Sequence, residues 1–141
     1  IVYMNWGKEF SNIVTSRQKE IAHKLIDSGA DIVVGSFPKV VQPVELYGDG
    51  IVFYSLGNYI TDEASTLARG GVIVQYNESQ NGEITFEMLP IKIEQGIPRL
   101  TTNSFYLNKT AKTLVSDIPS DRYMITNDGR VIINFKGETT A

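Results

Sequence analysis

The segment DIVVGSFPKVVQP, residues 31–43, decides the fold class because it joins a buried strand to a polar loop. Residues 31–34 are mostly β-branched and apolar, which is typical of a strand covered on both faces of a parallel sheet. Gly35 and the prolines of residues 35–43 then favour a bend. A loop just past a buried strand is the usual place for ligand-binding residues in an open α/β sheet.

The residues before this segment predict a helix and an earlier strand. Thr15 and Gln18 have the spacing of a capping box, so the helix is expected to begin near Ser16. Gly29 supplies a left-handed stop. Residues 1–4 are strand-like, and the order strand, helix, strand predicts a right-handed parallel crossover. The first part of the chain is therefore expected to be α/β.

The remainder of the chain predicts antiparallel strands and one further helix. Glycine-bounded turns separate short apolar runs, a pattern that favours hairpins. The expected strands are residues 44–47, 51–54, 72–76, 84–88, 91–93, 123–125 and 131–133, and the expected helix is residues 110–115. The overall class is thus a mixed α/β fold.

Composition excludes several classes of function. The 141 residues are 42% hydrophobic and 21% charged, which suits one globular core. The net charge is -3 and the basic residues are scattered, so nucleic acid is not an expected partner. There is no cysteine, which removes disulfides, thiolate zinc sites and thiol nucleophiles. No apolar run approaches the ~20 residues that cross a bilayer.

The residues able to support hydrolytic chemistry are few. His23, the single histidine, falls about 130° from the centre of the helical apolar stripe, which favours a surface or supporting role over catalysis. Without a second histidine or a cysteine, a metal site made by this chain alone would use oxygen ligands from Asp, Glu and Asn. The carboxylates are dispersed along the sequence, and Asp62 and Glu63 follow a turn at residues 57–58.

Glu9 is the candidate catalytic residue. It lies in the loop after the first strand, and residues 35–39 lie at the same end of the neighbouring strand, where α/β sheets bind ligands. Glu9 is otherwise a solvated loop charge. Asn5 is either a turn residue or a polar group directed at a ligand.

Five short stretches between residues 1 and 60 carry a family resemblance. They are YMNWGKEF (3–10), RQKEIAH (17–23), DSGADIVVG (27–35), VVQP (40–43) and FYSLGNY (53–59). In this order and spacing they resemble the C-terminal half of the capsule-synthesis CapA family, whose members are also called poly-gamma-glutamate capsule proteins. That family is itself similar to the calcineurin-type metallophosphoesterases. The resemblance implies half of a four-layer αββα sandwich in residues 1–100, with residues 101–141 as a helix and hairpin tail packing on it.

The resemblance also implies metal ligands, and this chain departs from them. The family usually has His-Trp-Gly where this chain has Asn5-Trp6-Gly7, and His-Pro-His where it has Phe37-Pro38-Lys39. Asn5 can still offer an oxygen to a hard metal. Phe37 offers no ligand, and the Lys39 ammonium would repel a divalent cation about 4 Å away in a partly desolvated site. No metal and no other cofactor is therefore expected.

The leading hypothesis is a capsule or poly-gamma-glutamate biosynthesis protein with a degenerate metal centre that binds rather than hydrolyses. Lys39 would hold an anionic polymer, a capsule precursor or a phosphate-like group, or it is a solvated lysine in a decayed site. The expected ligand-binding residues are Asn5, Glu9, Ser36, Lys39 and Asn58. One alternative is a hydrolase of phosphate or gamma-glutamyl bonds that uses Mn, Zn or Fe, and another is a non-catalytic scaffold.

The same resemblance sets expectations for partners and location. Other capsule-synthesis proteins are expected partners, and the expected location is the extracellular face of a bacterial membrane or the cell surface. Membrane attachment would come only from a segment outside this chain. The opening strand at residues 1–4 has no polar residues before it, which suggests an excised domain. A half sandwich exposes a sheet edge and apolar surface, so a homodimer or a rearranged packing is expected.

Overall fold

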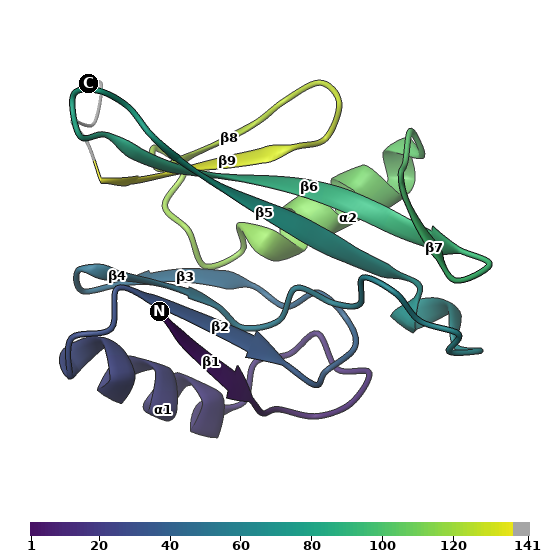
Figure 1. The fold of residues 1–141 in the computed structure, drawn as a ribbon, viewed down its shortest axis with the longest axis horizontal. Helices are drawn as coiled ribbons and strands as arrows, with labels where there is room; N and C mark the ends of the chain where they lie inside the picture. The colour runs from purple at the N-terminus through teal and green to yellow at the C-terminus, as the bar shows by residue number, and fades with distance from the viewer. Residues whose placement is uncertain (137–141) are drawn as a thin grey trace.

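The computed structural model describes residues 1–136, which form two sheets and two α-helices (Figure 1). The first sheet has the order β1-β2-β4-β3. Its strands are β1 (Val2–Asn5), β2 (Ile32–Ser36), β3 (Val44–Tyr47) and β4 (Gly50–Phe53). β1, β2 and β4 are parallel, and β3 runs antiparallel to β4. The predicted crossover and hairpin are confirmed.

Helix α1 (Ser16–Asp27) links β1 to β2 and covers one face of the first sheet (Figure 1). Thr15 Oγ1 accepts a hydrogen bond from the Gln18 backbone N–H at 3.2 Å, and Gln18 Oε1 accepts one from the Thr15 N–H at 3.0 Å. The predicted capping box is therefore present. Ala22 and Ile26 pack into a buried cluster with Val33 of β2.

The second sheet is entirely antiparallel, with the order β5-β6-β9-β8 and β7 paired to β6. A short 3-10 helix, η1 (Thr66–Ala68), leads into it. Its strands are β5 (Gly70–Glu78), β6 (Ile84–Glu94), β7 (Ile97–Leu100), β8 (Tyr123–Ile125) and β9 (Val131–Lys136). The antiparallel strands expected after the crossover are confirmed, and β7 was missed.

Strand β6 is one long strand where the sequence predicted two. Pro90 is opposite Val72 of β5, and the Val72 N–H donates outside the sheet to Leu56 O at 2.8 Å. On the other side of β6, β9 pairs only up to Met88 and β7 only from Ile91. No hydrogen bond of the sheet therefore requires an N–H at residue 90. The strand continues through Pro90 although proline has no N–H to donate.

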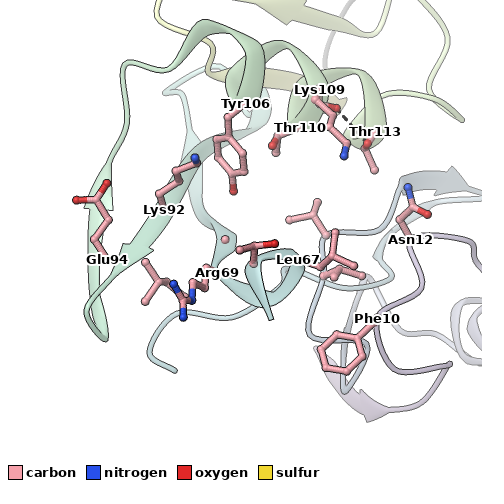
Figure 2. A pocket seen from close by; sticks show the side chains of 15 residues that line it. Phe10, Asn12, Leu67, Arg69, Lys92, Glu94, Tyr106, Lys109, Thr110 and Thr113 are labelled. Atoms are coloured by element: carbon pink, nitrogen blue, oxygen red, sulfur yellow. Dashed lines mark hydrogen bonds between the residues drawn. The ribbon is translucent and has the colours of Figure 1, made fainter. Parts of the chain in front are cut away.

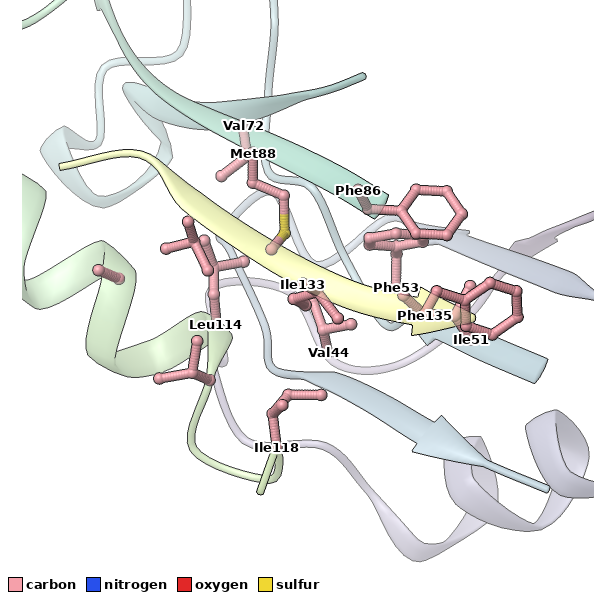
Figure 3. Close-up of a cluster of buried hydrophobic side chains, with 13 residues drawn as sticks. Val44, Ile51, Phe53, Val72, Phe86, Met88, Leu114, Ile118, Ile133 and Phe135 are labelled. Atoms are coloured by element: carbon pink, nitrogen blue, oxygen red, sulfur yellow. The ribbon is translucent and has the colours of Figure 1, made fainter. Parts of the chain in front are cut away.

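Helix α2 (Ser104–Leu114) begins earlier than predicted because Asn103 caps it, accepting from the Tyr106 N–H at 2.9 Å. Ala111 and Leu114 of α2 enter the main core, which lies between the two sheets (Figure 3). There the Phe86 ring meets Phe53 at 5.4 Å and Phe135 at 5.5 Å between centroids. Residues 101–136 thus share a core with the first sheet. The two sheets and the crossover are compatible with half of a metallophosphoesterase-like sandwich.

Strand β1 is an edge strand of the first sheet. Its Tyr3 side chain is 69% exposed. The exposed sheet edge anticipated from the sequence is therefore present at β1.

Candidate functional site

The loops that follow β1 and β2 lie side by side at the carboxyl end of the first sheet. Asn5 is the register partner of Ser36. Beyond the strands, the Trp6 N–H donates to Ser36 O at 3.2 Å and the Phe10 N–H donates to Pro38 O at 2.9 Å. The parallel pairing predicted from the sequence is what brings residues 5–10 against residues 36–39.

Trp6 and Gly35 form the base of this site. The Trp6 indole Nε1–H donates to Tyr54 O at 2.9 Å, and the Trp6 side chain is buried. This bond passes directly over Gly35, where an added Cβ would overlap both the indole and the Tyr54 carbonyl oxygen. A glycine is therefore needed at residue 35 because the Trp6 indole and the Tyr54 carbonyl approach its Cα closely, and not because its backbone adopts an unusual φ angle.

Two buried glutamine side chains hold the loop at residues 11–13. The Gln18 Nε2 donates to Gln42 Oε1 at 2.8 Å, and the Gln42 Nε2 donates to Ser11 O at 2.9 Å and Ile13 O at 3.2 Å. Both side chains are at most 1% exposed. Gln42 directly precedes Pro43 in the quoted segment, but nothing in the sequence pattern predicted that either amide would be buried.

Lys39 lies between two carboxylates. Its Nζ is 2.6 Å from Glu9 Oε1 and 2.9 Å from Glu63 Oε2, and it stands 5.3 Å from the centroid of the Phe10 ring. The hydrogen bonds to Glu9 and then to Glu63 raise the pKa of Lys39. The hydrogen bond from Lys39 is the main cause that lowers the pKa of Glu63. We call Lys39, Glu9 and Glu63 the Lys39 cluster.

The backbone around the Lys39 cluster is strained. Phe10, Phe37 and Lys39 have φ angles of 57°, 92° and 60°. Such left-handed conformations cost on the order of 1 kcal/mol each at residues with a Cβ. Side-chain contacts in these loops, including the two ion pairs of Lys39, hold conformations that an isolated chain would avoid. Strain of this kind gathers at ligand-binding sites.

The remaining predicted site residues are placed as follows. Ser36 Oγ donates to Met4 O at 3.3 Å, and Asn58 Nδ2 donates to Ala68 O at 3.0 Å. The Asn5 side chain is exposed, and Phe37 is 50% exposed. The structure therefore brings Glu9 to Lys39 and Asn5 to Ser36, while Asn58 is bonded to the segment before β5. Glu63 also belongs to the site, although its position in the sequence, among dispersed carboxylates, does not predict this.

His23 bonds to the first sheet. Its Nε2 is 3.1 Å from Glu45 Oε2, and its ring stacks on Tyr47 with 3.6 Å between centroids. The Tyr54 hydroxyl donates to the same Glu45 oxygen at 2.5 Å. Burial first, and then the Glu45 carboxylate, raises the pKa of Tyr54. His23 thus supports the contact between α1 and the hairpin of β3 and β4.

The residues of the Lys39 cluster do not fit a divalent metal. Among residues 1–136 there is no group of three or more His, Cys, Asp and Glu side chains arranged to hold one. Glu9 and Glu63 already share an ammonium group, and a metal placed between them would be repelled by Lys39.

Within residues 1–136, no helix is long and apolar enough to cross a membrane.

A cavity of about 560 Å³ is lined by loops of the first sheet and by β6 and α2 (Figure 2). Phe10, which contacts Lys39, also lines this cavity. Arg69 lines it as well, and its Nε donates to Glu63 O at 3.1 Å. The opposite wall comes from β6 and α2. The cavity therefore joins the loops of the first sheet to the second sheet, and no pattern in the sequence predicts it.

Fold and site together define an α/β chain that is compatible with half of a metallophosphoesterase-like sandwich and that holds an ammonium group between two carboxylates in its loops. The family described as "Bacterial capsule synthesis protein PGA_cap" matches residues 1–63. The chain is 36% identical over 117 residues to a capsule biosynthesis protein CapA of Bacillus anthracis, covering 83% of this chain and 28% of that protein. It is also 36% identical over 121 residues to a PGA biosynthesis protein CapA of Bacillus subtilis, covering 86% of this chain and 31% of that protein.

A more distant relative is a probable polyglutamine synthesis accessory protein of Mycobacterium tuberculosis, 32% identical over 62 residues, which are 44% of this chain and 16% of that protein. The chain belongs to the CapA-like capsule synthesis family. It spans less than a third of the length of these curated relatives.

Proposed function

We propose that this chain serves capsule or poly-gamma-glutamate biosynthesis at the bacterial cell surface as a binding component with a degenerate metal centre. The names of its relatives support the biosynthetic role. The observation that carries the rest is the Lys39 cluster, in which an ammonium group stands where the family resemblance implies a metal ligand.

Lys39 acts in this proposal as an internal replacement for the metal. A bound cation and an ammonium both neutralise the carboxylates of the surrounding loops and hold those loops together. An ammonium cannot acidify a water molecule as a metal does, so it cannot supply a hydroxide at neutral pH. The cluster can therefore hold the loops together but cannot supply the nucleophile.

The charge of the cluster also bears on where an anionic ligand binds. One ammonium between two carboxylates leaves a net charge of -1, so an incoming anion would compete with Glu9 and Glu63 for Lys39. Binding of an anionic polymer is therefore expected beside the cluster and not on Lys39 itself. This refines the expectation that Lys39 would hold the polymer directly.

The test is metal analysis of the full chain after loading with Mn²⁺, Zn²⁺ or Fe²⁺ and dialysis. Phosphodiester and gamma-glutamyl hydrolysis are assayed on the same samples. We expect far less than one metal per chain and no hydrolysis above the metal-free sample. Stoichiometric metal together with metal-dependent hydrolysis would overturn the proposal and favour the hydrolase alternative.

A further inference from the structure

The lining of the cavity beside the Lys39 cluster is basic, although the chain as a whole is acidic. Three cations line it, Arg69, Lys92 and Lys109, against one carboxylate, Glu94. The net charge of the whole chain is -3. The composition therefore gave no reason to expect a concentration of positive charge, and the fold creates one by bringing three separate segments together.

In contrast to Lys39, these three cations have no acidic partner among residues 1–136. Eight ion-pair contacts are formed among residues 1–136, and none involves Arg69, Lys92 or Lys109. Lys92 Nζ instead lies over the Tyr106 ring, 5.1 Å from its centroid. A cation held against an aromatic face keeps its charge available to an anion on its other side.

The cations surround the cavity and do not converge on one point. Figure 2 shows Lys92 beside Tyr106, Lys109 on the wall formed by α2, and Arg69 near the opposite loop. A single phosphate is best held by convergent donors or a bidentate arginine. Cations spaced around a cavity suit a ligand that carries its negative charges at intervals along a chain.

Apolar and hydroxyl groups complete the surface. Leu67 and Val41 line the cavity together with Thr110 and Thr113 of α2. Apolar lining of this kind can cover the methylene groups of a polymer backbone, and the Thr113 hydroxyl, which donates to Lys109 O at 3.0 Å, can still accept a hydrogen bond from an amide N–H. The surface is therefore suited to a polyamide that bears carboxylates.

We propose that this cavity binds a segment of a polycarboxylate chain, with Lys92, Lys109 and Arg69 each pairing with a carboxylate of the polymer. The choice of polymer rests on the proposed function in capsule or poly-gamma-glutamate biosynthesis. The site is separate from Lys39, whose ammonium is already shared by Glu9 and Glu63.

The experiment is calorimetric titration of the full chain with defined gamma-glutamate oligomers. The wild-type chain is compared with the Lys92→Met/Lys109→Met variant, in which methionine keeps most of the apolar length and removes the charge. We expect the double variant to lose about tenfold in affinity, since each of the two exposed ion pairs contributes roughly threefold. Raising the salt concentration is expected to weaken wild-type binding strongly and the double variant less.

The control is Lys136→Met, which makes the same substitution at one lysine of β9, outside the cavity lining. It is expected to bind as the wild type does. Circular dichroism and melting temperature confirm that the variants fold. Equal affinity in the wild type and the double variant, or no oligomer binding by the wild type at low salt, would overturn the proposal. Binding of inorganic phosphate or polyphosphate in place of the oligomers would overturn the polycarboxylate assignment.

These outcomes are distinguishable from a failure of the proposed function. Loss of oligomer binding leaves the metal and hydrolysis results untouched. Conversely, a metal-dependent hydrolase activity would overturn the degenerate centre, while the charge dependence of oligomer binding would still identify the cavity.

Discussion

The Lys39 cluster and the neighbouring basic cavity use positive charge in opposite ways. The Nζ atom of Lys39 lies within 3 Å of two carboxylates, so its positive charge is compensated by groups of the protein itself. Lys92 and Lys109 have no carboxylate at ion-pair distance among residues 1–136, and both face the cavity. The difference means that a loop lysine is not by itself available to an anionic ligand. The acidic residues around the lysine determine whether its charge is available to a ligand.

Gly35→Ala is expected to have the largest effect, because it disturbs the base under the Lys39 cluster. The new methyl group would overlap the Trp6 indole and the Tyr54 carbonyl, breaking their hydrogen bond. We expect the free energy of unfolding to fall by about 3 kcal/mol, measured by urea denaturation.

The matched control for this variant is Gly82→Ala, in the turn between β5 and β6. Nothing lies within 4 Å of its added methyl group, and only its φ of 80° opposes the change. A cost of about 1 kcal/mol is expected there. If the two variants lost equal stability, the close approach at Gly35 would not be an important constraint.

Phe37→His/Lys39→His is expected to have an intermediate effect and would turn the cluster toward metal binding. It removes the ammonium, places one imidazole at residue 39 beside Glu9 and Glu63, and adds a second imidazole two residues away; imidazoles and carboxylates are suitable ligands for Zn²⁺. Affinity for Zn²⁺, measured by calorimetry, is expected to rise about tenfold or more over the wild type.

Lys39→Met serves as the control because it removes the charge without adding a ligand. It is expected to gain much less affinity for Zn²⁺ than the double variant. No gain in either variant would mean that the loops at residues 5–10 and 36–39 have lost the geometry of a metal site as well as its ligands.

The smallest expected effect is in the pH dependence of stability. The pKa of Glu63 is lowered below its ordinary 4.5 by Lys39, so the ion pair contributes stability above about pH 4.5. That contribution is lost as the pH falls through the lowered pKa of the folded state. The melting temperature of the wild type is therefore expected to fall more steeply below pH 4.5 than that of Lys39→Met. Parallel curves would show that the pair is too screened to matter.

The local elements of the first sheet could be predicted from the sequence. The capping box at Thr15 and Gln18 and the β-branched run before Gly35 carry their own physical signals, and the structure has both. The start of α2 and the continuity of β6 could not be predicted in the same way. The start of α2 depends on the Asn103 cap, and the continuity of β6 depends on which residues lie beside Pro90 in the sheet.

The candidate site was predicted only in part. The spacing of Asn5, Glu9 and Lys39 along a βαβ unit was enough to expect Glu9 and Lys39 at one end of the sheet, and they are in contact. Glu63 and the basic cavity could not be expected, because they come from segments that local patterns do not connect. Hydrophobic periodicity says which residues are buried, but not which charged residues meet across loops.

The sequence by itself determined the βαβ crossover, the antiparallel character of the later strands and the family of the chain. These follow from local periodicity, capping and motif order, each of which acts within a short stretch. Only the tertiary structure decided that Lys39 is neutralised by Glu9 and Glu63, and that Arg69, Lys92 and Lys109 surround one cavity. Electrostatic interactions depend on distance in space, and distance in space is set by the packing of the two sheets.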